Sequence, residues 1–316
     1  VRAMYFKKLV SFIARSSNFC TKLNVKPVDI VITWVNSRDS QYMQDRQKYY
    51  QEGDNSTWRL PDVNNNELEL KTAILCIIKN IAWRGTIFIV TPYKQVPRCY
   101  HQLKNKYSSI QVIFNEQIWP KHLQQTLPAF NSHSVEANLH RIPKLSEKFI
   151  YFNDDVFVTK KLDYSSVFDR GKIVVQPFMS IPTRRNGSLY SYIWRNMLDT
   201  YLMYPPWHGF YALTKKAMSA TEKHMKNQWE QTISSRFRSK TDIPPVGATL
   251  NWAINNGQGV LACNPLVLDV FQDRDGVWNA GKVYHDVVCI NYTSDLPKSI
   301  NNLRASIGEL PNIESH

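Results

Sequence analysis

Four short apolar runs, rich in β-branched side chains, recur along the first half of the chain. They cover residues 28–35, 86–90, 110–114 and 149–152, and polar or turn-forming residues bound each of them. Runs of this length and composition are typical of strands that are buried on both faces of a parallel sheet. A shorter apolar run at residues 287–290 predicts a further strand near the C-terminus.

Segments between these strands have apolar residues at helical spacing. Residues 67–81 predict one helix, and residues 131–141 predict another, which Pro143 ends. Strands that alternate with helices predict an α/β fold, with a Rossmann-like parallel sheet core and helices on both faces. Beyond Phe178 the pattern turns helical and aromatic, over residues 191–204 and 213–233, which predicts a helical subdomain or lid.

The chain has 316 residues, which corresponds to about two average domains, although one large α/β domain also fits this length. We divide it into a basic N-terminal segment at 1–25, an α/β core at 26–178 and a helical lid subdomain at 179–260. A C-terminal segment at 261–316 is expected to return to the core. In such a sheet, ligands bind at the carboxyl ends of the strands.

Lysine and arginine outnumber aspartate and glutamate by 39 to 26, which gives a formal net charge of +13. Such a surplus attracts polyanions, for example nucleic acid, anionic lipid headgroups or phosphorylated substrates. The basic residues are dispersed, so we expect no nucleic-acid partner, and a plain solvated surface is the alternative. Residues 4–15 mix basic and apolar side chains, which fits either an amphipathic helix on an anionic membrane surface or ordinary packing.

The five cysteines are an odd number without a Cys-x-x-Cys pair, so we expect no disulfide framework and a reducing compartment. No run approaches the ~18 apolar residues of a membrane span, and no secretory signal is recognisable. Neither a P-loop nor a Gly-x-Gly-x-x-Gly motif occurs, which excludes the common glycine-rich phosphate cradles.

The sharpest chemical signal follows the fourth predicted strand, where the chain reads Asn153-Asp154-Asp155. Adjacent carboxylates at the carboxyl end of a buried strand suit a hard cation such as Mg²⁺. Proteins hold Mg²⁺ with one or two carboxylates together with substrate phosphates. The alternative is a β-turn or a helix N-cap, since asparagine and aspartate favour both.

Further polar residues are candidates for the same site. Asp39 follows the first strand, where a nucleotide usually binds in a parallel sheet, although residues 36–39 also form an ordinary turn sequence. His208 suits general-base chemistry near neutral pH, and Arg236 and Arg238 suit phosphate recognition. A histidine packed in the core or exposed at the surface is the plainer interpretation of His208.

Taken together, these segments resemble one family. Residues 29–39 look like its first conserved block. Its second block is similar to residues 66–68, 87–91, 127–132, 136, 139–142 and 145–157, the last of which end in Tyr-Phe-Asn-Asp-Asp-Val-Phe. His208 with Arg238 and Asp242 matches the third block, and Val288-Cys-Ile-Asn291 with Leu310-Pro311 matches the fourth. The chain thus resembles the Stealth family of sugar-phosphate transferases. That family includes bacterial capsular and cell-wall polysaccharide phosphotransferases and the catalytic subunit of N-acetylglucosamine-1-phosphotransferase.

The resemblance implies transfer of a hexose 1-phosphate from a UDP-sugar, either a UDP-N-acetylhexosamine or a UDP-hexose, to an acceptor sugar hydroxyl. A phosphodiester forms in surface polysaccharide synthesis and UMP leaves, with Mg²⁺ or Mn²⁺ as cofactor. It also implies a nucleotide-sugar-binding core at 26–178, like that of nucleotide-sugar transferases. The subdomain at 179–260 would receive the acceptor, a free or lipid-linked saccharide.

Carried over position by position, the resemblance implies a role for each matching residue. Asp154 and Asp155 would hold the metal with help from Asn291, and they would be catalytic together with His208 and Arg238. His208 would be the general base or, less simply, a phosphorylated nucleophile. Trp34, Val35, Asn36 and Asp39 would line the nucleotide site, and Asn131, Glu136, His140 and Arg141 would lie on the helix that faces the donor sugar. Arg236 would bind phosphate together with Arg238, and Glu67 is a further substrate-binding residue.

Three positions depart from the family pattern. Glu69 stands where the family usually has arginine, Tyr292 where it has aspartate, and Ser37 where it has glycine. Glu69 replaces a cation with an anion in a region thought to meet phosphate. Tyr292 removes a carboxylate from the metal region, for which Asp295 could substitute.

Two other functions stay open at this point. An ordinary metal-dependent glycosyltransferase would use the same donor and carboxylates, but it would break the bond between the anomeric carbon and oxygen and release UDP. A non-catalytic glycan- or polyanion-binding module would gain no thermal stability from Mg²⁺ or a nucleotide sugar. For the enzyme we expect a cytoplasmic location, peripheral at the inner face of the bacterial plasma membrane.

Overall fold

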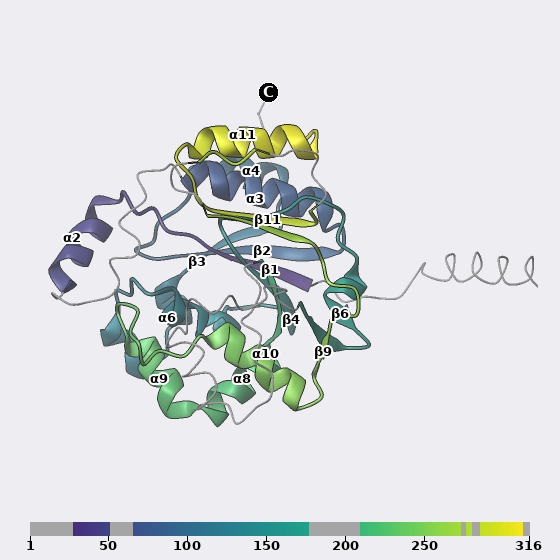
Figure 1. The fold of residues 1–316 in the computed structure, drawn as a ribbon. Coiled ribbons are helices and arrows are strands. Elements are labelled where there is room, and N and C mark those ends of the chain that lie inside the picture. Colours follow the sequence, from purple (N-terminus) through teal and green to yellow (C-terminus); the bar gives the residue numbers. More distant parts are fainter. Residues whose placement is uncertain (1–27, 51–65, 177–208, 273–275, 280–284, 312–316) are drawn as a thin grey trace, which may run out of the picture.

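The computed structural model describes residues 28–50, 66–176, 209–272, 276–279 and 285–311. A central β-sheet lies between helices, with two smaller sheets beside it (Figure 1). The predictions for residues 1–25, for a helix at 191–204 and for His208 lie outside the described residues.

The central sheet has the strand order β3-β2-β1-β4-β8. The first four strands are parallel, and β8 pairs antiparallel with β4 at one edge. β1 is buried along its length because it has a strand on each side and helices on both faces. The predicted α/β fold with a parallel sheet core is therefore confirmed. The strands are β1 (Val28–Thr33), β2 (Arg84–Thr91), β3 (Ile110–Phe114), β4 (Lys148–Asn153) and β8 (Tyr211–Thr214).

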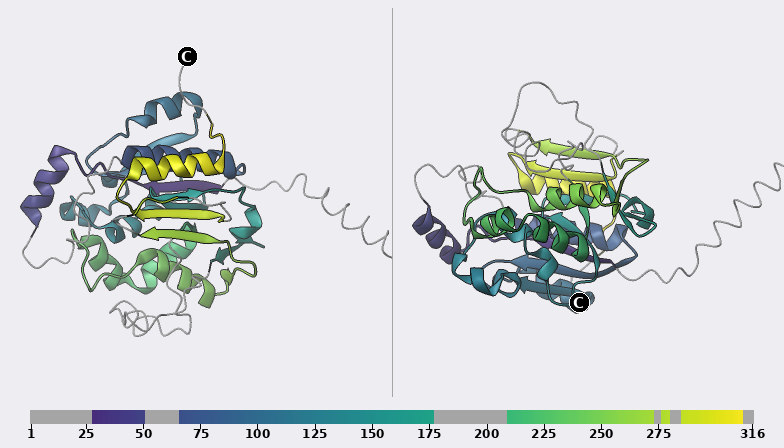
Figure 2. Two further views of the ribbon diagram at one scale, coloured as in Figure 1. Left: turned by 45° about the horizontal axis from the view of Figure 1, so that its top comes forward. Right: turned by 90° about the horizontal axis from the view of Figure 1, so that it is seen from below.

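Two layers of helices cover the central sheet (Figure 1 and Figure 2). One face carries α3 (Asn66–Asn80), α4 (Cys99–Lys106) and α11 (Leu296–Ile307). The other face carries α6 (Ser132–Glu136), α8 (Lys215–His224), α9 (Lys226–Ser234) and α10 (Pro245–Asn255). Met218, Trp229 and Leu250, one each from α8, α9 and α10, join the same buried apolar cluster as the strands. The described part of segment 179–260 thus supplies a helical layer on the core and, in β8, an edge strand of the central sheet.

The smaller sheets extend the core at its sides. One has the order β10-β11-β5 and contains β10 (Leu268–Gln272), β11 (Val287–Tyr292) and β5 (Val156–Val158). The other has the order β6-β7-β9, from β6 (Phe168–Asp169), β7 (Lys172–Val175) and β9 (Gly259–Leu261). β11 pairs antiparallel with β5, which follows β4 directly, so the C-terminal segment reaches the end of β4. The remaining elements are α2 (Ser40–Tyr49), α5 (Asn115–Ile118), η2 (Lys121–Thr126), η3 (Leu139–Arg141) and η4 (Tyr164–Ser166).

The helix predicted at 131–141 is two short pieces, α6 and η3. Side chains take the carbonyl groups that a longer helix would need. Asn138 donates its amide to the carbonyl of Ser134, and Trp229 and Arg141 donate to the carbonyl of Ala137. The helix can therefore end there without leaving buried carbonyls unpaired.

The helical pattern at 213–233 is also interrupted in the structure. Residues 211–214 form edge strand β8 against β4, and Thr214 then caps α8 by accepting a hydrogen bond from the amide of Ala217 at 3.0 Å. The helix stops at Met225 and restarts as α9. In the polar stretch 41–66, which has no strong periodicity, residues up to Tyr49 form α2.

Asp29 ties the start of β1 to both neighbouring strands. Its carboxylate is 4% exposed and accepts hydrogen bonds from the amides of Thr86 at 2.8 Å and Ser146 at 2.7 Å. We predict that Asp29→Ala lowers the free energy of unfolding by about 2–4 kcal/mol, because two buried amides lose their partner. Asp29→Asn keeps one acceptor oxygen and should lose less. Urea unfolding measures both, and an Asp29→Ala protein as stable as the wild type would contradict the prediction.

Candidate active site

The carboxyl ends of β1 and β4 lie side by side at the point where the strand order reverses. β2 and β3 lie on one side of β1 and β4 on the other. Thr33 is paired with Asn153, so the two strands end level with one another. Ligands of open α/β sheets bind outside the carboxyl ends of the strands at such a reversal. Residues 34–36 and 154–155, which the sequence singles out, follow these two strands.

Asp154 and Asp155 form the turn between β4 and β5. Asp154 is half-buried, whereas Asp155 is 8% exposed. The Oδ2 atom of Asp155 accepts a hydrogen bond from the thiol of Cys289 at 3.6 Å. Its Oδ1 atom is buried and has no hydrogen-bond partner among the residues that the structure describes. A buried carboxylate oxygen normally has a donor or a cation against it, so this atom is a candidate metal ligand.

The oxygen-rich turn fits a hard cation that also takes ligands from its substrate. Across the described ranges, no three His, Cys, Asp or Glu side chains gather into a metal-binding group. Mg²⁺ typically needs only one or two protein carboxylates when substrate phosphates supply the rest. The amide of Ile290 donates to the carbonyl of Asp155 at 3.1 Å, which brings the backbone before Asn291 to this turn. The side chain of Asn291 lies outside what the structure describes, so its role as a ligand stays a prediction.

The hydroxyl of Tyr151 joins three elements just behind the acidic turn. It lies 3.1 Å from Oγ1 of Thr33 on β1 and donates to Oδ1 of Asn153 at 2.7 Å. Oε1 of Glu136, at the end of α6, is 3.3 Å away. Burial, with the negative charge of Glu136 nearby, raises the pKa of Tyr151 well above its usual value, so the phenol stays protonated.

Sequence reasoning missed Tyr151, although a signal was present. Residues 151 and 153 alternate along the strand, which places them on one face of the sheet just before the Asp154–Asp155 turn. A tyrosine on that face, inside an otherwise apolar run, needs a partner for its hydroxyl when it is buried. The hydroxyl of Tyr151 links Glu136, which the resemblance assigned to the donor sugar, to Asn153, which directly precedes the Asp154–Asp155 turn.

The predicted nucleotide-binding residues after β1 are held in different ways. The side chain of Gln95 accepts from the amide of Asn36 at 2.8 Å and donates to its carbonyl at 3.3 Å. Trp34 is buried, and its indole nitrogen has no hydrogen-bond partner. Asp39 caps α2 by accepting from the amide of Tyr42 at 2.9 Å. Val35, Asn36 and Trp34 therefore line the exit of β1, while the carboxylate of Asp39 is engaged by its helix.

Asn131, at the start of α6, binds the loop that contains Ser235 and Asp242. Its Oδ1 atom accepts from the amide of His133 at 3.1 Å, and its amide donates to Oδ2 of Asp242 at 2.7 Å. Arg238 donates to the hydroxyl of Ser132 at 2.5 Å. Residues more than a hundred positions apart thus meet at the N-terminus of α6. Because α6 has five residues, Ser132 and Glu136 are about 6 Å apart along its axis.

Arg236 is bound to the protein itself. Its guanidinium donates to the carbonyl of Gln125 at 2.8 Å and lies over the ring of Tyr49, 4.5 Å from the centroid. Arg238, by contrast, is exposed. Of the two arginines predicted to bind phosphate, the structure leaves Arg238 more accessible to a ligand.

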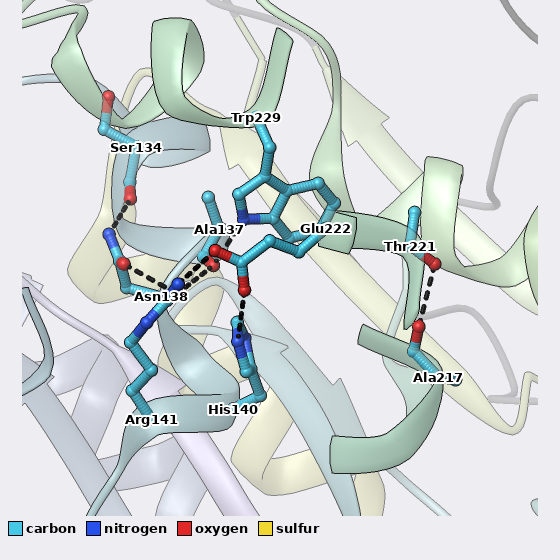
Figure 3. A network of polar contacts seen from close by, with 9 residues as sticks. All are labelled: Ser134, Ala137, Asn138, His140, Arg141, Ala217, Thr221, Glu222 and Trp229. Atoms are coloured by element: carbon cyan, nitrogen blue, oxygen red, sulfur yellow. Dashed lines mark hydrogen bonds and ion pairs between the residues drawn. The ribbon is translucent and has the colours of Figure 1, made fainter. Parts of the chain in front are cut away.

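His140 and Arg141 form an ion-pair network with α8 (Figure 3). Nε2 of His140 donates to Glu222 at 3.0 Å, and Arg141 pairs with the other oxygen of the same carboxylate. Burial alone would raise the pKa of Glu222, but the hydrogen bond from His140 and the charge of Arg141 outweigh it and lower the pKa. Burial lowers the pKa of His140 itself. Both residues, expected to face the donor sugar, hold α8 against η3.

Glu67 has a similar structural contact, since its Oε1 atom accepts from the amide of Arg98 at 2.9 Å. His208 lies outside the described residues, but the chain that follows it is described. Phe210 packs against Phe152 with ring centroids 5.3 Å apart, and Tyr211 pairs with Tyr151. The chain therefore enters β8 beside the carboxyl end of β4.

Comparison with known proteins identifies the conserved region. The family model described as Stealth protein CR2, conserved region 2, matches residues 63–175, which include the acidic turn and α6. Residues 63–175 are thus similar to Stealth conserved region 2. The predicted resemblance to the Stealth family is thereby confirmed.

Two curated relatives that this chain resembles are capsular polysaccharide phosphotransferases. The one from Haemophilus influenzae is 34% identical over 234 residues, which cover 69% of this chain and 62% of that protein. The one from Aeromonas hydrophila is 32% identical over 238 residues, again 69% and 62%. The chain thus spans about three fifths of the length of these relatives.

Among solved structures, an active-site variant of the galactosyltransferase LgtC has a similar fold. The TM-score is 0.50 at 11% sequence identity, and the match covers 90% of this chain and 98% of that one. At this identity the likeness concerns the fold alone. The helices in the part of the chain that the structure describes include none long and apolar enough to cross a membrane.

His133, at the N-terminus of α6, makes this end of the helix sensitive to pH. Burial, with the positive charge of Arg238 nearby, lowers the pKa of His133 to about 3, and its Nδ1 atom has no partner. In the unfolded chain the pKa is near 6.5, so the unfolded state binds the proton first and stability falls as pH drops below about 6.5. A single such group contributes up to about 1.4 kcal/mol per pH unit.

We therefore predict that the wild type loses about 2 kcal/mol more stability between pH 7 and pH 5 than His133→Asn does. Urea unfolding at both pH values measures the difference. The comparison cancels the contributions of the other titrating groups. Identical pH dependence in the two proteins would contradict the prediction, because the pKa of His133 would then be the same in the folded and the unfolded protein.

Proposed function

We propose that this chain binds a UDP-sugar at the carboxyl ends of β1 and β4 and transfers its sugar 1-phosphate to an acceptor sugar hydroxyl. UMP leaves, and a phosphodiester of a surface polysaccharide forms. The observation that carries the proposal is the unpartnered Oδ1 atom of Asp155 at the reversal of strand order. The similarity to capsular polysaccharide phosphotransferases over 69% of the chain supports the reaction class.

Asp154 and Asp155 would hold Mg²⁺ or Mn²⁺, with Asn291 as a further oxygen ligand. The cation supplies positive charge that neutralises the diphosphate of the donor. Tyr151 holds Asn153 and Glu136 behind this turn, so the carboxylates need little rearrangement on binding. Trp34, Val35 and Asn36, which Gln95 fixes through the Asn36 peptide, would line the nucleotide.

Arg238 would contact a donor phosphate from the other side. Its guanidinium is exposed, and its loop is held by Asp242, which accepts from both Asn131 and the amide of Ser239. The hydrogen bond to Ser132 orients the guanidinium toward α6. Arginine in this arrangement can donate two parallel hydrogen bonds to phosphate oxygens.

His208 would act as the general base for the acceptor. The acceptor oxygen attacks the phosphorus that carries the sugar, and the bond to the bridging oxygen of the diphosphate breaks. UMP takes this oxygen, and the proton of the acceptor hydroxyl passes to His208. The substrates imply a cytoplasmic enzyme at the inner face of the bacterial plasma membrane, where a net charge of +13 favours anionic lipids.

A metal-dependent glycosyltransferase is the second candidate, because the fold is similar to that of LgtC. That enzyme would use the same donor site but would attack the anomeric carbon, so UDP would leave. The leaving group separates the two functions without any assumption about the acceptor.

We predict that UMP is the nucleotide product. The protein would be incubated with Mg²⁺, a saccharide acceptor and either UDP-N-acetylhexosamine or UDP-hexose, and the nucleotides analysed by mass spectrometry. UMP formed in step with an acceptor that gains a sugar phosphate supports the proposal. UDP as the product would replace it with the glycosyltransferase.

Binding and turnover can be separated with two variants. A true donor site stabilises the fold by about 2.7 kcal/mol at a hundredfold excess of ligand over Kd, which raises Tm by a few degrees. We predict that Asp155→Asn loses this Mg²⁺-dependent rise with UDP-N-acetylglucosamine. His208→Ala should keep the rise but lose about 10²–10⁴-fold in turnover. Asp163→Asn, outside the site, is the control, and an unchanged rise in Asp155→Asn would remove Asp155 from the site.

A further inference from the structure

Cys289 lies on β11 against the acidic turn. Its side chain is fully buried, at 0% exposure, and its thiol is 3.6 Å from Oδ2 of Asp155. Cys289 pairs with Val156, and the next residue, Ile290, donates its amide to the carbonyl of Asp155. β11 therefore contacts both the backbone and the side chain of Asp155.

The two carboxylate oxygens of Asp155 consequently have different surroundings. Oδ2 faces the thiol, whereas Oδ1 is buried without a hydrogen-bond partner. A carboxylate with no donor on either oxygen can rotate, because its terminal torsion is broad. A donor on one oxygen fixes the carboxylate plane and leaves the other oxygen for a cation. A thiol is a weak donor, but its hydrogen bond gains strength in a buried environment.

We propose that Cys289 is a positioning residue for the cation ligand Asp155, whose Oδ2 atom it holds so that Oδ1 faces the cation. The inference rests on the proposed function, since it gives the thiol a purpose only if a cation binds. Groups that hydrogen-bond to metal ligands typically change metal affinity by 10–100-fold when they are removed. The surroundings of Cys289 are apolar, with Val156, Val158 and Val287 in the same buried cluster, which suits a thiol better than a hydroxyl.

The test uses variants that separate the thiol hydrogen from the volume of the side chain. Cys289→Val fills the space, suits a strand and has no donor, whereas Cys289→Ser keeps a donor. Cys76 provides the matched control, because it is equally buried, at 0% exposure, and packs beside the same strand in the cluster with Val288. Cys76→Val removes a buried thiol that has no contact with Asp155. If valine is not accommodated at 289, Cys289→Ala serves as the donor-free variant.

The Kd of Mn²⁺ in the presence of UDP would be measured from the electron paramagnetic resonance signal of free Mn²⁺, and urea midpoints would report stability. We expect Cys289→Val to weaken Mn²⁺ binding about tenfold or more. Cys289→Ser should bind close to the wild type, and Cys76→Val should bind as the wild type does. Two results together would show that Cys289 acts by positioning rather than by packing. Cys289→Ser should restore Mn²⁺ binding, and Cys289→Val should change stability about as much as Cys76→Val does.

Wild-type affinity in the donor-free variant overturns the inference and leaves the proposed function intact. Equal weakening in Cys289→Val and Cys289→Ser also overturns it, because volume rather than the donor would then matter. A wild type that binds no Mn²⁺ with UDP overturns both the inference and the proposed function.

Discussion

The parallel pairing of β1 with β4 is the constraint on which the candidate site depends. It sets Thr33 level with Asn153, so residues 34–36 and the Asp154–Asp155 turn follow their strands at one edge of the sheet. The pairing is held at its far end by Asp29, whose carboxylate binds both flanking segments. A shift of one residue would turn every side chain of β4 to the other face and carry Tyr151 away from Thr33.

Most polar side chains near this edge are already bound to the protein, and this separates supporting residues from candidate ligands. Asn131, Arg236, His140 and Arg141 are tied to carbonyls or carboxylates within the fold. In contrast, one oxygen of Asp155 is buried and without a partner. Burying an ionised oxygen without a partner costs several kcal/mol, which a bound cation would offset. The candidate cation ligand therefore lies among polar side chains whose hydrogen bonds and ion pairs are already made within the protein.

The sequence predicted the parallel sheet well because buried strands carry continuous apolar runs that mark them locally. It also predicted that the acidic turn would follow β4. It could not show which polar residues bind other parts of the protein rather than a ligand, because their partners are distant in the sequence. His140 pairs with Glu222, 82 positions away, and Asn131 with Asp242, 111 positions away. Cys289 was missed for the same reason, since it looks like an ordinary member of a buried strand until its contact with Asp155 is known, whereas Tyr151 was missed although its position in the strand was a signal. The break between α6 and η3 likewise depends on Trp229, a residue of another helix.

The central claim is that a divalent cation binds at Oδ1 of Asp155, beside the ends of β1 and β4. Anomalous X-ray scattering from crystals grown with Mn²⁺ and UMP would locate the cation directly. We expect one Mn²⁺ peak about 2.0–2.3 Å from Oδ1 of Asp155, with a phosphate oxygen of UMP as another ligand. UMP bound elsewhere on the protein, or Mn²⁺ with no ligand from the Asp154–Asp155 turn, would contradict it.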